Sequence, residues 1–496
     1  MLENKPGASH SERLGEALKQ LSKDTAVYGV STIVGRFLNF LLVPFYTNIF
    51  LPEEYGIITN IYAFIAILNI IFIYGMDAAY LRFAKNEEIG NEKDIFSTPY
   101  FAVLIFSLIF SLIIIWLKVP LGESFAVPDN YNYLFLFVAS ILFTDAIAVI
   151  PFIRLRIERR SKKFAAFKII NIVINVSLNL YLILKLKMGI EAVFISNLVA
   201  SVITFFLLTP SILKLLNFSF SSSIFKRMLK FGLPYLPAGL GSILIQVIDR
   251  PIMEHLTDLN TLGIYQANHK LGIFMMLFVS MFQYAWQPFF MQESKSEDAK
   301  KIFSRVLTYF TLVASIILIV LSLFIDNIIR FEIFGKTIIG QDYWSGVTVV
   351  PVILFAYMFN GLYVVFTAGI YIKEKSIYVP LITGAGAVVN IISNFILIPV
   401  LGMMGAALSV LASYIVMAAG LYFVTQKFYK INYEKKKIAI IFLLILLFGA
   451  IYYFLYYNIE IILIYKFLML ILFLASILFF VIDKKEIEFI KNKFSR

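Results

Sequence analysis

The chain contains a succession of apolar runs, each long enough to cross a lipid bilayer as a helix. About 20 apolar residues cover the roughly 30 Å of bilayer hydrocarbon, where helices satisfy their own backbone polar groups. The 496 residues are 60% hydrophobic and only 15% charged, against about 25% charged residues in an average soluble domain. We therefore predict an all-α integral membrane protein with fourteen transmembrane helices, at residues 25–50, 56–81, 95–117, 131–153, 164–184, 189–211, 229–251, 262–289, 303–325, 346–370, 377–398, 402–426, 438–457 and 461–482.

The residue types that are scarce in the chain exclude several kinds of function. There is no cysteine and there are three histidines, which excludes disulfides, thiol catalysis and iron–sulfur clusters and argues against a transition-metal site. The longest outer connection, residues 326–345, is too short for a folded catalytic domain. We predict a protein that is not an enzyme and has no cofactor. Its net charge of +12 would suggest nucleic acid in a soluble domain, but here it surrounds apolar spans, and we predict no nucleic-acid partner.

The positions of lysine and arginine predict the orientation, because these residues are retained on the cytoplasmic side of membrane proteins. With the N-terminus inside, 33 of the 43 basic residues fall in cytoplasmic segments or at the cytoplasmic ends of the spans, and five fall in outer loops. The segment 154–163 alone carries six of them. We predict that both termini are cytoplasmic and that residues 1–24 form a polar cytoplasmic segment rather than a signal peptide.

Two motifs recur along the chain at similar distances. Pro44 and Gly56, twelve residues apart around the first outer loop, reappear as Pro251 and Gly263, an offset of 207 residues. An Asn-x-x-x-Asn pair at positions 175 and 179 reappears at positions 390 and 394, an offset of 215 residues. Similar offsets indicate an internal duplication.

The duplication predicts how the chain is divided. We expect two six-helix halves, 25–211 and 229–426, joined by a cytoplasmic linker at 212–228 and followed by two further helices and a tail at 427–496. Because six is even, the two halves have the same orientation and form parallel repeats with a cleft between them.

Charged residues within the spans are functional candidates, because each costs about 2.5–3.5 kcal/mol at the bilayer centre. Arg36 lies at mid-depth in the first span, with Asn39 on the same helix face. The seventh span places Gln246 close to Arg250, and Lys270 follows in the eighth span after Tyr265. Guanidinium and ammonium groups match phosphate well, so the excess of positive charge predicts an anionic ligand.

The acidic residues of the spans, Asp77, Asp145 and Asp249, have two interpretations. They are candidates for ion coupling, or they neutralise a nearby basic residue: Arg82 for Asp77, Lys168 for Asp145, and Arg250 or Lys270 for Asp249. For Lys168 and Lys466 we favour extension of the side chain to a membrane interface. For the asparagine pairs we favour hydrogen bonds between helices.

The start of the seventh span is weakened by Pro234, Pro237 and Gly239. Proline removes a backbone hydrogen bond, so this segment predicts a hinge for alternating access, with a static kink as the alternative.

Several motifs together resemble those of a known family. The stretch Asp249-Arg250-Pro251, with Gly263 through Ala267 and Lys270, is similar to the junction of helices 7 and 8 in Wzx-type polysaccharide flippases. These belong to the multidrug/oligosaccharidyl-lipid/polysaccharide exporter superfamily. Further similar stretches are 52–56, 75–82 and 394–407, and the resemblance extends over residues 20–426.

The resemblance implies a flippase that moves an undecaprenyl-pyrophosphate-linked oligosaccharide across the bacterial cytoplasmic membrane for O-antigen, capsule or exopolysaccharide assembly. Arg36, Arg250 and Lys270 would contact the pyrophosphate, while Asn39, Gln246 and Tyr265 would bind sugar hydroxyls. Membrane lipids and the polysaccharide polymerase machinery are the other expected partners. A lipid II flippase and a drug or cation antiporter of the same superfamily remain as alternatives.

Overall fold

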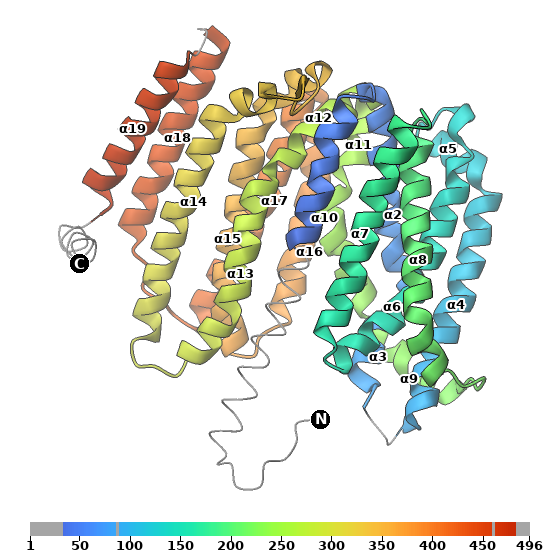
Figure 1. The fold of residues 1–496 in the computed structure, drawn as a ribbon. Helices are drawn as coiled ribbons and strands as arrows, with labels where there is room; N and C mark the ends of the chain where they lie inside the picture. Colours follow the sequence, from blue (N-terminus) through green and yellow to red (C-terminus); the bar gives the residue numbers. More distant parts are fainter. Residues whose placement is uncertain (1–32, 86–88, 459–461, 483–496) are drawn as a thin grey trace. The chain divides into compact units, whose positions relative to one another are not determined.

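A computed structural model describes residues 33–85, 89–458 and 462–482 (Figure 1). The predicted cytoplasmic segment 1–24 lies outside the described residues. The all-α fold is confirmed, apart from one short hairpin of strands β1 (Glu332–Ile333) and β2 (Lys336–Thr337). Phe334 and Gly335 connect these strands with positive φ angles of 52° and 73°, as a tight two-residue hairpin turn requires.

Twelve described helical segments are long and apolar enough to cross a membrane. They are α2 (Pro52–Ile73), α4 (Glu92–Trp116), η2 with α6 (Asp129–Ile157), α7 (Ser161–Leu184), α8 (Glu191–Leu215), α12 with η3 and α13 (Leu259–Glu293), α14 (Ala299–Arg330), η4 with α15 (Gln341–Ile372), α16 (Tyr378–Leu401), α17 (Met403–Phe428), α18 (Lys435–Asn458) and α19 (Leu463–Phe480).

Two further segments account for the remaining predicted spans. The bent pair α9 (Ser222–Gly232) and α10 (Tyr235–Val247) occupies the seventh, and the shorter apolar helix Ile33–Thr47 occupies the described part of the first. The fourteen predicted runs therefore all correspond to helical structure, but their boundaries and continuity differ from the prediction.

Three of the predicted spans are interrupted. The second ends as α2 at Ile73 and resumes as α3 (Met76–Phe83), because Tyr74 and Gly75 adopt left-handed conformations with φ of 37° and 79°. The seventh consists of α9, α10 and α11 (Asp249–Leu256). The eighth is interrupted by the 3-10 turn η3 (Lys270–Gly272) between α12 (Leu259–His269) and α13 (Ile273–Glu293).

The chain forms two compact units, one ending at Gly263 and one beginning at Ile264. In the first unit, α6 packs against α2, α4 and α8, while α7 covers α8. Helices α10 and α11 pack on α2, so the helices of the predicted seventh span pack with those of the first unit. Packing and sequence duplication divide the chain at different points, and the repeat boundaries therefore stay a prediction.

Two glycines of the repeated motif lie in reciprocal contacts within the first unit. A Cβ on Gly56 would overlap the backbone carbonyl of Leu259, and a Cβ on Gly263 would overlap that of Pro52. Pro52 and Leu259 are themselves 207 residues apart, the same offset as the two glycines. Glycine is thus required at both positions because the N-terminal turns of α2 and α12 touch through their backbones.

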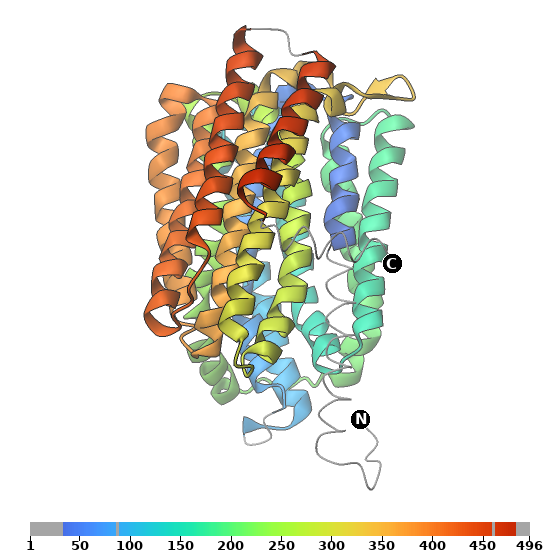
Figure 2. The ribbon, with the colours of Figure 1, turned by 90° about the vertical axis from the view of Figure 1, so that its left-hand side faces the viewer.

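In the second unit, α15 packs against α13, α14 and α17, and α16 packs on α17. The two C-terminal helices α18 and α19 form a hairpin that packs on α14 (Figures 1 and 2).

Candidate functional site

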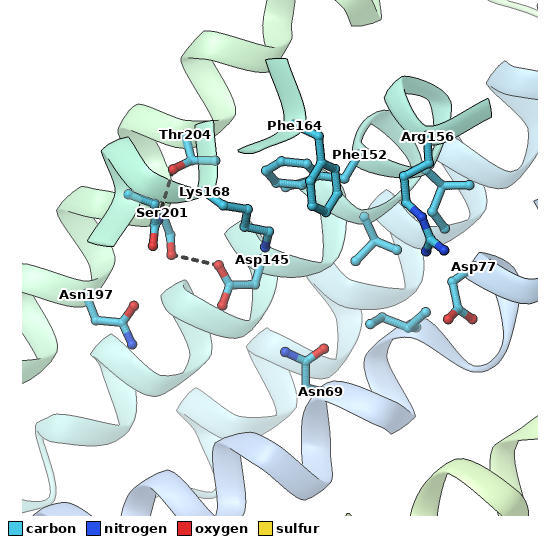
Figure 3. A pocket seen from close by; sticks show the side chains of 15 residues that line it. Asn69, Asp77, Asp145, Phe152, Arg156, Phe164, Lys168, Asn197, Ser201 and Thr204 are labelled. Carbon is cyan, nitrogen blue, oxygen red and sulfur yellow. Dashed lines mark hydrogen bonds between the residues drawn. The ribbon is translucent and has the colours of Figure 1, made fainter. Parts of the chain in front are cut away.

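The first unit contains a polar cavity of about 430 Å³ among helices α2, α3, α6, α7 and α8 (Figure 3). Four charged side chains line it, together with amide and hydroxyl groups: Asp77, Asp145, Arg156, Lys168, Asn69, Asn171, Asn197, Ser201 and Thr204. Since about 30 Å³ is one water's share of liquid volume, the cavity has room for roughly fourteen waters. That is sufficient for hydrated ions, but a lipid-linked oligosaccharide is larger.

Asp145 and Lys168 extend into this cavity from α6 and α7. Ser201 Oγ on α8 donates a hydrogen bond of 2.6 Å to Asp145 Oδ1. The Lys168 ammonium lies 4.4 Å from the centre of the Phe152 ring, and Figure 3 shows it pointing toward the Asp145 carboxylate. The two do not form a direct ion pair within the described part of the chain. The structure therefore brings together the pair that the sequence allowed, with cation–π and hydroxyl contacts supporting each charge.

A second pair of opposite charges lines the same cavity. Asp77 follows the left-handed turn that separates α2 from α3, and Arg156 is on the last turn of α6. Figure 3 shows the Arg156 guanidinium extending toward the Asp77 side chain. Arg82, the partner suggested by sequence, forms no ion pair with Asp77 among residues that the structure describes. Two acids and two bases make the lining close to neutral, which lowers the cost of placing charge within the spans.

Side-chain hydrogen bonds hold the uncharged lining in place. Asn171 Nδ2 on α7 donates to Thr204 Oγ1 on α8 at 2.9 Å, and Asn197 Nδ2 donates to the Tyr62 hydroxyl at 3.0 Å. Asn197, Ser201 and Thr204 are spaced by four and three residues, so they form one polar face of α8. That spacing was the available sequence signal for this cavity. Arg156 lies in the dense basic segment 154–163, which the sequence links to membrane orientation.

Arg36 and Asn39 are both exposed on the helix Ile33–Thr47. Tyr28 and Thr32, which the sequence places on the same face, lie outside the described residues. Gln246 is exposed on α10, where its Nε2 donates to the carbonyl of Ser242 at 3.1 Å.

Arg250 is half-buried at the start of α11 and its guanidinium is poorly satisfied. Nη1 donates one long hydrogen bond of 3.5 Å to the carbonyl of Thr59, and the buried Nε has no hydrogen-bond partner. No acidic residue in the described ranges forms an ion pair with it. This arginine therefore retains donors for an anionic ligand.

Asp249, next to it, is 1% exposed, and neither of its carboxylate oxygens accepts a hydrogen bond from the described residues. The pairing with Arg250 that the sequence allowed is absent. Burying a polar group without hydrogen bonds costs folding free energy, so Asp249 stays a functional candidate.

Lys270 and Tyr265 belong to the second unit. Lys270 is half-buried and is the first residue of the 3-10 turn that interrupts the eighth span. Tyr265 is fully buried, with its ring centre 5.4 Å from that of His269, so contact with a sugar requires it to become exposed.

The predicted hinge coincides with a bend. Pro234 precedes α10, Pro237 lies in its first turn and Gly239 follows one turn from its start. Helices α9 and α10 differ in direction by 45° at this break. A kink is thus present, and movement about it stays a prediction.

Two predictions about buried polar groups can be compared with the structure directly. Lys466 does not extend to an interface: it is 2% exposed, and its ammonium bonds both carboxylate oxygens of Asp326, at 2.7 Å. The interpretation as an extended lysine is wrong because an acid 140 residues earlier lies within reach. Asn179 does bond between helices, accepting a hydrogen bond of 2.7 Å from the Tyr46 hydroxyl.

No group of three or more metal-binding side chains is found in the part of the chain that the structure describes.

Comparison with known proteins identifies both a family and a fold. A model of the family described as "Polysaccharide biosynthesis protein" matches residues 47–337, more than half of the chain. A search among curated proteins finds no match.

Three solved structures are similar over most of their length. The lipid II flippase MurJ, in its inward closed conformation, gives a TM-score of 0.73 at 15% identity, covering 92% of this chain and 98% of that one. An inward-facing multidrug resistance MATE family transporter of the MOP superfamily gives 0.65 at 12% identity, covering 79% and 94%. A MOP superfamily transporter from Pyrococcus furiosus gives 0.56 at 14% identity, covering 82% and 95%. At these identities the similarity concerns the fold.

Proposed function

This chain belongs to the polysaccharide biosynthesis protein family, and we propose that it is a flippase for a lipid-linked oligosaccharide. Its substrate is an undecaprenyl-pyrophosphate-linked repeat unit, which it transfers from the inner to the outer leaflet of the bacterial cytoplasmic membrane by alternating access. Both termini are cytoplasmic in this proposal, because 33 of the 43 basic residues then lie on that side. The protein acts as a transporter and not as an enzyme, and it delivers substrate to the polysaccharide polymerase machinery.

The observation that carries the proposal is the state of Arg250. Its guanidinium lies in the region that matches the family model, has one long hydrogen bond and an unpartnered Nε, and forms no ion pair with the described residues. A pyrophosphate offers several oxygen acceptors to such a group. Arg36 and Lys270 supply further positive charge to the head group, and Asn39, Gln246 and Tyr265 are assigned to sugar hydroxyls.

The membrane potential favours outward transport of this anion. A pyrophosphate diester carries about two negative charges, and each charge gains about 2.3 kcal/mol per 100 mV on leaving a negative interior. The cavity that contains Asp77 and Asp145, and the buried Asp249, are the proposed places for a coupled cation or proton. The size of this cavity and the charge of these acidic residues suit small ions.

A transport assay tests the assignment of the head-group ligands. In proteoliposomes that carry a fluorescent polyprenyl-pyrophosphate sugar, Arg250→Ala and Arg36→Ala should each slow translocation by about ten- to a hundredfold, the loss expected for one or two charge-assisted hydrogen bonds. Arg227→Ala is the matched control, because it removes an exposed arginine from α9. Wild-type rates in both test variants would contradict the proposed binding site.

The choice of substrate separates this function from its relatives. The proposal requires transport of the polyprenyl-pyrophosphate sugar in preference to lipid II and to a cationic dye. Faster movement of lipid II would favour a lipid II flippase, and movement of the dye against a sodium or proton gradient would favour a drug or cation antiporter.

A further inference from the structure

A second cavity, of about 330 Å³, lies in the second unit at the ends of three membrane-spanning helices. Its lining consists of Lys300, Lys301, Lys430 and Asn432. Lys300 and Lys301 are in the first turn of α14, and Lys430 and Asn432 are in the connection between the end of α17 at Phe428 and the start of α18 at Lys435. Three lysines therefore converge on one concave surface at the end of the spans.

The connection that carries Lys430 and Asn432 is held rigidly. Tyr429, Ile431 and Tyr433 are buried, whereas Lys430 and Asn432 between them are exposed. Residue 431 is fixed at both its backbone groups by Gln426, whose Nε2 donates to the carbonyl at 2.8 Å and whose Oε1 accepts from the N–H at 3.1 Å.

A further hydrogen bond ties this connection to α14. Ser304 Oγ donates to the carbonyl of Asn432 at 2.9 Å. These anchors and the alternation of buried and exposed residues hold the backbone from which Lys430 and Asn432 extend. A preorganised site loses less conformational entropy on binding.

The positive charge around the cavity is only partly compensated. Lys301 pairs with Asp298 at 3.0 Å, but both side chains are largely exposed, so the pair contributes little. The nearby Glu434 is engaged elsewhere, accepting a hydrogen bond of 2.6 Å from Thr308 Oγ1 and facing Lys437 at 3.7 Å. Neither Lys300 nor Lys430 forms an ion pair with any residue in the described ranges.

Aromatic rings lie close to the lysines of this cluster. The Lys300 ammonium lies 5.2 Å from the centre of the Tyr429 ring, and Lys427 and Lys375 lie 5.8 Å and 5.6 Å from that of Phe428. Aromatic and basic residues at the ends of transmembrane helices are typical of the interface between hydrocarbon and water. A ligand at this depth can keep acyl chains in the bilayer while its phosphate reaches the lysines.

We propose that this cavity binds the phosphate of an anionic phospholipid headgroup, with Lys300, Lys301 and Lys430 as its cationic ligands and Asn432 as a hydrogen-bond donor. Basic pockets at the ends of transmembrane helices provide the charge that such headgroups require. The site is independent of the transported substrate, because none of its residues belongs to the proposed transport pathway. It gives the second unit a specific lipid contact in addition to its general embedding in the bilayer.

Native mass spectrometry of the detergent-solubilised full chain, titrated with phosphatidylglycerol, tests the proposal. Each lysine that donates a charge-assisted hydrogen bond to the phosphate contributes at least about tenfold to the affinity, so Lys300→Ala/Lys430→Ala should weaken the tightest binding event at least about a hundredfold. The matched control, Lys435→Ala/Lys436→Ala, removes two exposed lysines next to the cavity that do not line it. These two lysines contribute only screened long-range attraction in the proposal, so the control should retain the affinity to within about fivefold. Lys300→Arg/Lys430→Arg, which keeps the charge, should bind within the same range.

Each outcome decides the proposal. Equal weakening in the Lys300/Lys430 and Lys435/Lys436 alanine variants would show diffuse attraction and overturn a specific site, as would unchanged binding in the Lys300/Lys430 variant. Phosphatidylcholine, whose headgroup is neutral overall, should not compete with phosphatidylglycerol, and equal competition would overturn the requirement for an anionic headgroup. Millimolar inorganic phosphate should fail to displace the lipid. Displacement would identify free phosphate as the ligand and overturn the lipid assignment.

Discussion

Replacing Lys466 by methionine tests how the C-terminal helical hairpin is fastened to the second unit. The Lys466 ammonium bonds both oxygens of Asp326 at 2.7 Å and Oδ1 of Asn327 at 2.6 Å. The lysine side chain is 2% exposed and that of Asp326 is 23% exposed. Helix α19 also contacts α14 through the rings of Phe467 and Phe324, and α18 through those of Phe473 and Phe448. Among the described residues, Lys466 provides the side-chain hydrogen bonds that join α19 to α14.

The geometry gives the size of the expected effect. Removing one partner of a buried ion pair costs about 3–5 kcal/mol, because the remaining charge is left without compensation. Asp326 is partly accessible, so water replaces some of the lost interaction, and the lower end of about 3 kcal/mol applies. Methionine retains the apolar stem of the lysine, which limits any loss of packing. A change of 3 kcal/mol corresponds to about a 150-fold increase in the opening equilibrium of α19.

Thiol labelling measures this opening directly because the chain has no cysteine of its own. Ile477→Cys places a thiol at a position that is 2% exposed, about three turns from Lys466 on α19. In liposomes, its alkylation by a membrane-permeant maleimide should be about a hundredfold faster with Lys466→Met than without, if α19 opens and closes faster than it reacts. Lys435→Met, at the exposed start of α18, is the matched control and should leave the rate unchanged.

A second variant separates loss of the ion pair from loss of shape. Adding Asp326→Leu to Lys466→Met removes the uncompensated carboxylate, and replacing both partners of a buried pair by apolar residues is often neutral. Labelling should then slow again by at least about tenfold. An unchanged rate in the single variant would refute the claim that this pair fastens the hairpin. Fast labelling in the double variant would show that packing, and not uncompensated charge, governs the opening.

Three further substitutions probe the first unit. Gly263→Ala should lower the free energy of unfolding by about 1–3 kcal/mol, because its Cβ would overlap the backbone of α2. Gly384→Ala is the control, because this glycine has open space around it and the substitution should leave that free energy unchanged. Thermal unfolding in detergent compares the two variants. Tyr46→Phe removes the hydroxyl that donates to buried Asn179 and should cost about 1–3 kcal/mol in the same measurement. Asp145→Asn removes the carboxylate next to Lys168 in the cavity. It should abolish any proton or sodium dependence of transport in proteoliposomes. If that dependence is retained, the cavity is not the site of ion coupling.

The number and approximate placement of the spans could be predicted because each depends on about 20 consecutive apolar residues, a local property of sequence. The interruptions within the spans could not be predicted in this way. Tyr74 and Gly75 break the second span within a continuous apolar run, and η3 breaks the eighth at Lys270. Such breaks are stabilised by contacts with other helices, as where Gly75 meets the backbone of Gly232, and those contacts are not visible in one segment alone.

The candidate site was predictable only in part, for the same reason. Asp145 and Lys168 were identified because a charge within an apolar run is visible locally, and their proximity across α6 and α7 was one of two alternatives. Arg156 was assigned to topology because it lies in a dense basic segment, yet its side chain faces the cavity beside Asp77. Whether a charge at the end of a span is solvated or lines a cavity depends on the neighbouring helices, which sequence spacing does not specify.

Helix α14 is longer than the helix to which the predicted duplication relates it, and its additional residues make contacts of their own. The offset between the predicted repeats is 207 residues at the glycine motif and 215 at the asparagine pair, so the second repeat is longer between these points. Helix α14 has 32 residues, whereas α4, the corresponding third helix of the first repeat, has 25. Its apolar run was predicted at 303–325, and the helix extends beyond that run at both ends. One extension carries Lys300 and Lys301 of the proposed lipid site, and the other carries Asp326 and Asn327, which hold Lys466. The residues of α14 beyond the predicted run therefore supply polar groups at both ends of one span: Asp326 and Asn327 hold Lys466 of α19, and Lys300 and Lys301 line the cavity proposed to bind lipid.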